Sequence, residues 1–165
     1  MSGLTELFLE QLGNMVHVEN LLIKALPRMA EVSRSDELRE IFEEHFEETK
    51  KQLTRVQRVF KEFGLDAREK KCDSMLALLT EARRVGDRWK NSPIIDSALI
   101  CAAQKVEHHE IISYASLCAW ADELGERDAA KWLKESLEEE KTADKKLARL
   151  IEKSAQINAD ELAVI

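Results

Sequence analysis

The sequence predicts an all-α protein, a four-helix bundle with a long crossover that contains a shorter fifth helix. Only 5 glycines and 2 prolines occur among the 165 residues, where an average soluble chain of this length carries roughly 20 of these two. So few turn-forming residues exclude the many tight turns of a β-sandwich or a barrel. Apolar residues recur instead at helical spacing over long stretches. The length suits one domain, residues 1–165.

The first two long helices are expected at about residues 3–31 and 35–63. Ser35 can cap the second helix and Gly64 can end it. A single acid interrupts the apolar stripe of the first helix, which reads Phe8, Leu12, Met15, Glu19, Leu22, Leu26 and Met29. The stripe of the second helix reads Phe42, Phe46, Thr49, Leu53, Val56, Phe60 and Phe63.

The one long connection follows, and it is weakly amphipathic from 73 to 89, where we expect a shorter helix. At about 1.5 Å per residue this segment spans roughly 25 Å. That length carries the chain back along the bundle, so that the next long helix starts near the end where the second one started. The topology is therefore a bundle with a crossover.

The last two long helices are expected at about 93–124 and 127–154, with a tail or a docked turn after them at 158–165. Ser92 serves as the cap of the first of these and Pro93 lies in its first turn. Its inward stripe reads Ile100, Ala103, Glu107, Glu110, Tyr114, Leu117 and Ala121. The final helix has the stripe Leu133, Leu137, Glu140, Asp144, Leu147 and Ile151.

Charge, hydrophobicity and cysteine content indicate which partners, location and cross-links to expect. The chain has 32 acidic and 25 basic residues and a formal net charge of −7, which disfavours nucleic acid and fits metal cations. Neither a signal-like start nor an apolar run of membrane-spanning length occurs, so we expect a cytoplasmic protein without a membrane partner. The cysteines, Cys72, Cys101 and Cys118, are odd in number and lack Cys-x-x-Cys spacing, so no disulfide framework is expected.

Five acids fall on stripes that must face the core, namely Glu19, Glu107, Glu110, Glu140 and Asp144. Burial of an isolated carboxylate costs several kcal/mol. Such a group persists only if its members are protonated, paired with cations or bound to metal. The phase of these acids, more than their number, therefore indicates a site.

The same acids also match in depth along the bundle. Glu107 and Glu110 lie 18 and 15 residues before Gly125, while Glu140 and Asp144 lie 15 and 19 after it. In the first hairpin, Glu19 lies 14 residues before position 33, and two polar residues of the second helix, His45 and Glu48, lie 12 and 15 after it. Antiparallel partners therefore meet within a few ångström of one level.

Seven candidate ligands result, and they suit two iron or two manganese ions about 3.5–4 Å apart. They are Glu19, His45, Glu48, Glu107, Glu110, Glu140 and Asp144. A thiolate-type zinc site is disfavoured by the oxygen-rich donor set.

Other interpretations stay open for several of these residues. His45 and Glu48 lie one residue off the apolar stripe, so His45 could be a core histidine bonded to a carboxylate and Glu48 a solvated residue. The two acid pairs, Glu107 with Glu110 and Glu140 with Asp144, could instead form salt bridges within a dimer contact.

Three further polar residues flank the candidate ligands. His108 could donate a hydrogen bond to a ligand, and His109 is expected at the surface. Tyr114 could contact a metal-bound water, or it could fill the core with its hydroxyl on a carboxylate, which we favour.

Five stretches resemble the YciE/YciF-type proteins of the ferritin-like superfamily, a bacterial stress-associated group. They are Glu19-Asn20-Leu21-Leu22-Ile23-Lys24-Ala25-Leu26-Pro27, Glu44-His45-Phe46-Glu47-Glu48-Thr49, Lys71-Cys72-Asp73-Ser74-Met75, Gln104-Lys105-Val106-Glu107-His108-His109-Glu110-Ile111 and Glu139-Glu140-Lys141-Thr142-Ala143-Asp144. The resemblance covers nearly the whole chain. It implies a ferritin-like bundle, a homodimer and a di-metal site built from the seven candidate ligands.

The pattern departs from that of the better-known ferritin-like proteins, which place Glu-x-x-His on two helices. Here the corresponding helices read His45-x-x-Glu48, Glu107-x-x-Glu110 and Glu140-x-x-Ala143, so a second histidine is missing. We expect a di-iron or di-manganese protein that reacts with dioxygen or hydrogen peroxide in stress protection. The alternative is a bundle without enzymatic activity that binds metal or serves as a dimeric structural module.

Overall fold

The structure is a computed structural model that describes residues 2–163, with side chains up to residue 154. Five helices account for most of the described chain, and their bounds are α1 Gly3–Val32, α2 Asp36–Glu62, α3 Asp73–Trp89, α4 Ile95–Glu123 and α5 Arg127–Ala163. The predicted fold class, an all-α bundle of four long helices with a crossover and a shorter helix, is confirmed. None of the described helices combines the length and the apolar character that a bilayer span requires.

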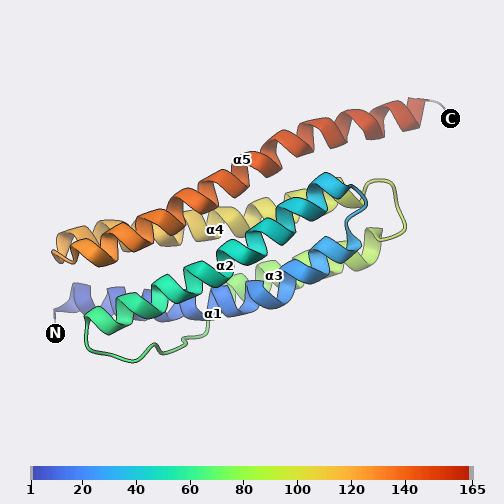
Figure 1. Ribbon diagram of the computed structural model, residues 1–165. Helices are drawn as coiled ribbons and strands as arrows, with labels where there is room; N and C mark the ends of the chain where they lie inside the picture. Colours follow the sequence, from blue (N-terminus) through green and yellow to red (C-terminus); the bar gives the residue numbers. More distant parts are fainter. Residues whose placement is uncertain (1, 164–165) are drawn as a thin grey trace.

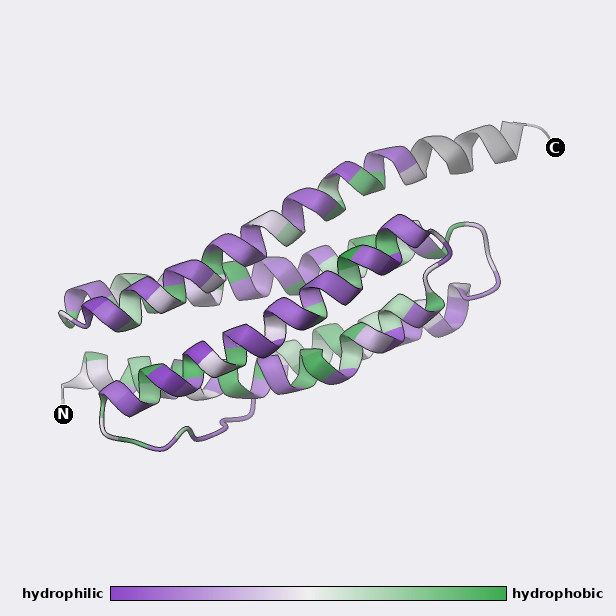
Figure 2. Cartoon of the chain, viewed as in Figure 1, coloured by the Kyte–Doolittle hydropathy of each residue, from purple (hydrophilic) through white to green (hydrophobic). Residues whose placement is uncertain are grey.

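The four long helices form two antiparallel hairpins, α1 with α2 and α4 with α5 (Figure 1). α2 packs against α5 and α1 against α4, which joins the hairpins into one bundle. Helix α3 carries the chain back along the outside and packs on α4 and α1. Accordingly, α1 and α4 are the more hydrophobic of the long helices, while α2 and α5 carry long hydrophilic faces (Figure 2).

Glycine ends two of the long helices by the same device. Gly64 and Gly125 have φ angles of 66° and 77°, a left-handed conformation that glycine adopts without strain. After α2, the Leu65 N–H bonds to the Phe60 carbonyl and the Gly64 N–H to the Lys61 carbonyl. This pattern satisfies the last carbonyls of the helix and turns the chain away from its axis.

The crossover loop is anchored on α1 before α3 begins. The Lys70 N–H donates to the Gly13 carbonyl at 2.9 Å, and the Cys72 N–H donates to His17 Nδ1 at 2.9 Å. A Cβ on Gly13 would lie 2.9 Å from the Arg68 carbonyl oxygen, closer than real contacts allow. Glycine at this position therefore lets the loop approach the helix.

An acid at the start of α4 ties it to the connection between α1 and α2. Both oxygens of the Asp96 carboxylate accept backbone N–H groups, from Arg34 and from Ser35, each at 2.8 Å. Ser35 also caps α2 as predicted, because its hydroxyl accepts the Leu38 N–H. The end of α1, the start of α2 and the start of α4 therefore meet at one place.

Two of the expected helix bounds differ from the structure by more than one residue. α4 begins at Ile95 rather than 93, because residues 92–94 form a turn in which the Ile95 N–H bonds to the Ser92 carbonyl. α5 continues to Ala163 rather than stopping at 154. No proline or glycine follows Ser154 to break the helix, so the tail expected at 158–165 is helical as far as Ala163. Its last two residues lie outside the described chain.

The inward stripe of α2 was also predicted one residue out of phase at two points. The buried positions are His45 and Gln52, whereas Phe46 and Leu53 are only partly buried against the edge of the core. The buried face of α2 reads Leu38, Phe42, His45, Thr49, Gln52, Val56, Val59 and Phe60. The expectation that His45 lies one residue off the inward stripe is therefore wrong, because this helix turns polar side chains inward at mid-length.

Candidate metal centre

A group of polar residues is buried at mid-bundle, where apolar packing would be expected. Glu19 comes from α1, His45 from α2, Glu107 and Glu110 from α4, and Glu140 from α5. None of the five is more than 3% exposed. Each lies on the helix face that packs against the other helices, so the same periodicity that builds the core delivers these side chains to it.

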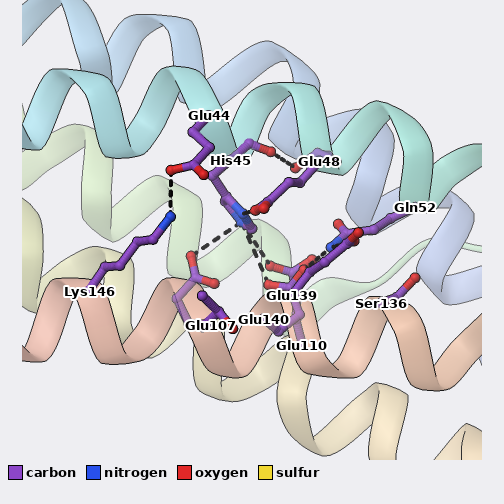
Figure 3. Close-up of polar contacts among 12 residues, drawn as sticks. Glu44, His45, Glu48, Gln52, Glu107, Glu110, Ser136, Glu139, Glu140 and Lys146 are labelled. Atoms are coloured by element: carbon purple, nitrogen blue, oxygen red, sulfur yellow. Dashed lines mark hydrogen bonds and ion pairs between the residues drawn. The ribbon is translucent and has the colours of Figure 1, made fainter.

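His45 lies at the centre of the group (Figure 3). Its Nε2 is 3.4 Å from a Glu107 oxygen, 3.6 Å from a Glu140 oxygen and 4.0 Å from a Glu110 oxygen. One ligand atom from each of these four residues lies within 4.8 Å of every other. Three helices therefore bring four potential ligands close enough together to hold a metal ion.

Glu19 completes the buried group from the side of α1. The Tyr114 hydroxyl, on the stripe of α4 one turn after Glu110, donates a hydrogen bond to Glu19 Oε1. Tyr114 is itself fully buried. Of the two roles considered for this tyrosine, the structure supports the one in which it fills the core with its hydroxyl on a carboxylate.

The two remaining candidates lie at the rim of the group. The Glu48 side chain is 22% exposed, and its Oε2 is 3.4 Å from His45 Nδ1. The Asp144 side chain is 21% exposed and pairs with His108 at 3.2 Å. The negative charges of both still act on Glu107. Neither shares the cluster in which the four central ligands converge.

The histidines that follow Glu107 take different places. His108 is mostly exposed and contacts only the rim acid Asp144 among the candidate ligands. His109, expected at the surface, is half-buried instead. Its Nε2 lies 2.8 Å from the Ser74 hydroxyl and 3.7 Å from Cys72 Sγ, so it ties α4 to the start of α3.

Gln52 is a buried polar residue of the site that lies outside the predicted apolar stripe of α2. Its amide donates to Glu140 and to Glu139, and Arg55 forms a two-pronged salt bridge with Glu139 at 2.7 and 2.8 Å. Spacing could have found it, because Gln52 lies seven residues after His45 on the same helix face. The neighbouring Leu53 gave a more conventional apolar stripe.

The environment of the buried acids favours their protonated form when no cation is present. Burial raises the pKa of Glu107 to about 8. Burial, reinforced by like charge, also raises the pKa values of Glu19, Glu110 and Glu140 well above the usual range. Burial alone would lower the pKa of His45, but the negative charge of Glu140 and a contact with Glu48 outweigh it and raise that pKa.

With the acids ionised, many polar atoms of the group have no hydrogen-bond partner among the described residues. Six such buried atoms belong to it, namely Glu19 Oε2, His45 Nε2, Glu107 Oε2, both carboxylate oxygens of Glu110 and Glu140 Oε2. An unpaired buried polar atom costs about 1–3 kcal/mol. One imidazole nitrogen and five carboxylate oxygens that converge in this way fit divalent cations such as iron or manganese.

Comparison with known proteins places the chain in a family. Residues 3–160 match the family model described as a domain of unknown function, DUF892. The chain belongs to the DUF892 family. It is 40% identical over 151 residues to protein YciF of Escherichia coli K12, and the match covers 91% of each chain. The family resemblance read from the five sequence stretches is therefore confirmed.

Solved structures share this fold. The crystal structure of the E. coli stress protein YciF matches with a TM-score of 0.90 at 39% identity, over 94% of this chain and 99% of that one. YcfI from Rhodopseudomonas palustris, proposed to be a structural protein, matches with a TM-score of 0.86 at 35% identity, over 89% and 94%. A protein from Xanthomonas campestris shares the fold, with a TM-score of 0.73 at 22% identity over 98% and 97%.

Proposed function

We propose that this DUF892 protein is a ferritin-like di-metal carboxylate protein that holds two iron or two manganese ions at mid-bundle. The observation that carries the proposal is the set of six buried ligand atoms without hydrogen-bond partners. Salt bridges to Lys or Arg, the alternative considered for Glu107, Glu110 and Glu140, do not account for these atoms, because among the described residues the only cationic group within 4.0 Å of these three carboxylates is His45.

In this proposal the five buried residues supply the central ligands, and Glu48 and Asp144 complete the set from the rim. Bound Fe²⁺ or Mn²⁺ would supply the electrons for the reduction of dioxygen or hydrogen peroxide. The surrounding bundle excludes bulk water. The Tyr114 hydroxyl donates a hydrogen bond to Glu19 Oε1 and so orients that carboxylate. The expected role is stress protection, in line with the description of the YciF relative as a stress protein.

A second function is favoured by a specific observation. YcfI, the relative from R. palustris, is proposed to be a structural protein. In this alternative the chain binds metal, or forms a dimeric structural or interaction module, without turnover. The single histidine of the group fits it as well, because the better-known ferritin-like sites have two.

For either function we propose a homodimer that acts in the cytoplasm, with metal ions and dioxygen or peroxide as its small partners. Nucleic acid is not proposed as a partner, since the net charge of −7 would repel phosphate.

Metal content tests the site itself. Metal-free protein reloaded with Fe²⁺ without oxygen, or with Mn²⁺, is expected to retain about two ions per chain after gel filtration. The double variant Glu107→Ala, Glu140→Ala removes ligands from two helices and is expected to retain none. A double variant of exposed acids, Glu138→Ala with Glu47→Ala, serves as the matched control. An unchanged metal content in the ligand variant would rule out the site.

Turnover separates the two functions. If the protein is an enzyme, the metal-loaded form oxidises Fe²⁺ or removes hydrogen peroxide faster than the same concentration of free metal. Metal-loaded protein that shows neither acceleration supports the binding or structural function instead.

A further inference from the structure

Gln52 is a fully buried amide that reaches the metal-binding group from α2 on the side facing α5. Its Nε2 donates to Glu140 Oε1 and, at 3.1 Å, to Glu139 Oε2. The reverse orientation of the amide would point its carbonyl oxygen at two carboxylates, so the contacts fix which atom is the donor. Figure 3 shows this side chain directed toward the two adjacent acids.

The second acceptor of this amide is held from outside. Arg55, one turn further along α2, donates two hydrogen bonds to the Glu139 carboxylate at 2.7 and 2.8 Å and one to the Ser136 hydroxyl at 3.3 Å. A two-pronged bond of this kind fixes the plane of the carboxylate. Hydrogen bonds therefore connect Arg55, Glu139, Gln52 and Glu140 in a continuous series, from the partly exposed edge of the α2–α5 contact to the buried centre.

This series of hydrogen bonds leaves Glu140 with one carboxylate oxygen available to a metal ion. Its Oε1 accepts from Gln52, while its Oε2 has no hydrogen-bond partner and lies 3.6 Å from His45 Nε2. Glu110 differs, because both of its oxygens are buried without a partner. Two carboxylates of the same group are thus prepared for different binding modes by their surroundings.

We propose that Gln52 is a positioning residue that restricts Glu140 to a single metal-facing oxygen, with the Arg55–Glu139 pair holding Gln52 in place. The inference rests on the proposed metal site and adds to it a residue outside the set of ligands. Groups that orient a metal ligand typically change metal affinity 10–100-fold when they are removed. If Gln52 only joined α2 to α5, its removal would change the stability of the protein and leave its metal affinity unchanged.

Gln52→Met tests the proposal, since methionine has a similar length and no N–H donor. Binding of Mn²⁺ to metal-free protein is measured by titration calorimetry, and the visible spectrum of Co²⁺-loaded protein reports the coordination number. We expect Mn²⁺ to bind 10–100-fold more weakly with unchanged stoichiometry, and the Co²⁺ spectrum to change. Arg55→Met is also expected to weaken Mn²⁺ binding, but by less, because Glu139 remains to accept the hydrogen bond from Gln52. It decides the matter if Gln52→Met does not fold.

The matched control is Arg58→Met. Arg58 also joins α2 to α5, with its guanidinium 4.7 Å from the centre of the Trp132 ring, and it does not touch the site. This variant is expected to bind Mn²⁺ like the unmodified protein. If Gln52→Met matches the control in affinity and spectrum, the positioning role is wrong although the metal site stands. If the unmodified protein binds none of Mn²⁺, Co²⁺ and Fe²⁺, the proposed metal site fails and this inference fails with it.

Discussion

Removal of metal should make the stability of this protein depend steeply on pH. The pKa of Glu107 is about 8 in the fold against 4.5 for an ordinary glutamate. A carboxyl whose pKa is raised by folding contributes its full stability below the pKa of the unfolded chain and loses it as pH rises toward the folded value. Metal-free protein should therefore lose stability between about pH 4.5 and 8.

The magnitude follows from the width of that interval. Each pH unit inside it costs about 1.4 kcal/mol per carboxyl that stays protonated. Between pH 5.5 and 7.5, Glu107 alone costs the metal-free protein about 2.5 kcal/mol, a large part of a typical stability of roughly 5–15 kcal/mol. The raised pKa of His45 acts in the same direction, because its protonated form is lost as pH rises.

Urea unfolding at pH 5.5, 6.5 and 7.5 measures this effect, with and without saturating Mn²⁺. Metal-loaded protein should not show the loss, because its ligands are ionised in both the folded and the unfolded state. Glu107→Gln should reduce the pH dependence of the metal-free protein and stabilise it at pH 7.5. Exposed Glu138→Gln should do neither. Metal-free stability that stays constant or rises over this range would refute the buried-acid reasoning.

Three further changes test the fold and the setting of the site through thermal or urea unfolding. Gly13→Ala should cost about 1–3 kcal/mol by pressing the crossover loop off α1, whereas Gly3→Ala, in open space, should change little. Equal effects would contradict the close approach. Tyr114→Phe should destabilise metal-free protein by about 1–3 kcal/mol, because Glu19 loses its hydrogen-bond donor. An unchanged unfolding midpoint would show that this hydrogen bond does not contribute to stability. Asp96→Ala should cost about 0.5–1.5 kcal/mol through the loss of two hydrogen bonds to backbone N–H groups, one exposed and one partly buried, and a neutral result would mean that water replaces the carboxylate.

Much of the fold could be predicted because local sequence patterns determine where its helices form and where two of them end. Stripes at helical spacing place the long helices, and Gly64 and Gly125 mark two ends whose φ angles only glycine adopts easily. The extension of α5 past residue 154 was missed, since a helix without a breaking residue gives no signal of where it ends. The start of α4 was placed early because Ser92 and Pro93 both suit a first turn, and here they form a turn that precedes it.

The site could be predicted where its residues are acids in phase with apolar neighbours or, for His45, where a ligand-type residue lies at the same level along the bundle. Glu19, Glu107, Glu110 and Glu140 satisfied that test, and all are buried. Gln52 did not, because a neutral amide next to a leucine resembles an ordinary surface residue. Its role depends on which face of α2 meets α5, and that contact joins helices far apart in the sequence.

The sequence could favour a carboxylate as the partner of the Tyr114 hydroxyl, but it could not say which carboxylate receives which hydrogen bond. The bond from Tyr114 to Glu19 joins α4 to α1, and the bond from Gln52 to Glu140 joins α2 to α5. Helical spacing gives the level of each side chain along the bundle but not the rotamer that carries its polar atoms. For the same reason Asp144 shared the expected level but lies at the rim with His108.

Anomalous diffraction from crystals grown with iron and manganese, recorded on both sides of each absorption edge, tests the central claim most directly. The proposal predicts two anomalous peaks per chain at mid-bundle, within bonding distance of His45, Glu107, Glu110 and Glu140 and with Glu19 beside them. Crystals that show no peak among these residues, with their carboxyl groups bonded to one another instead, would contradict it.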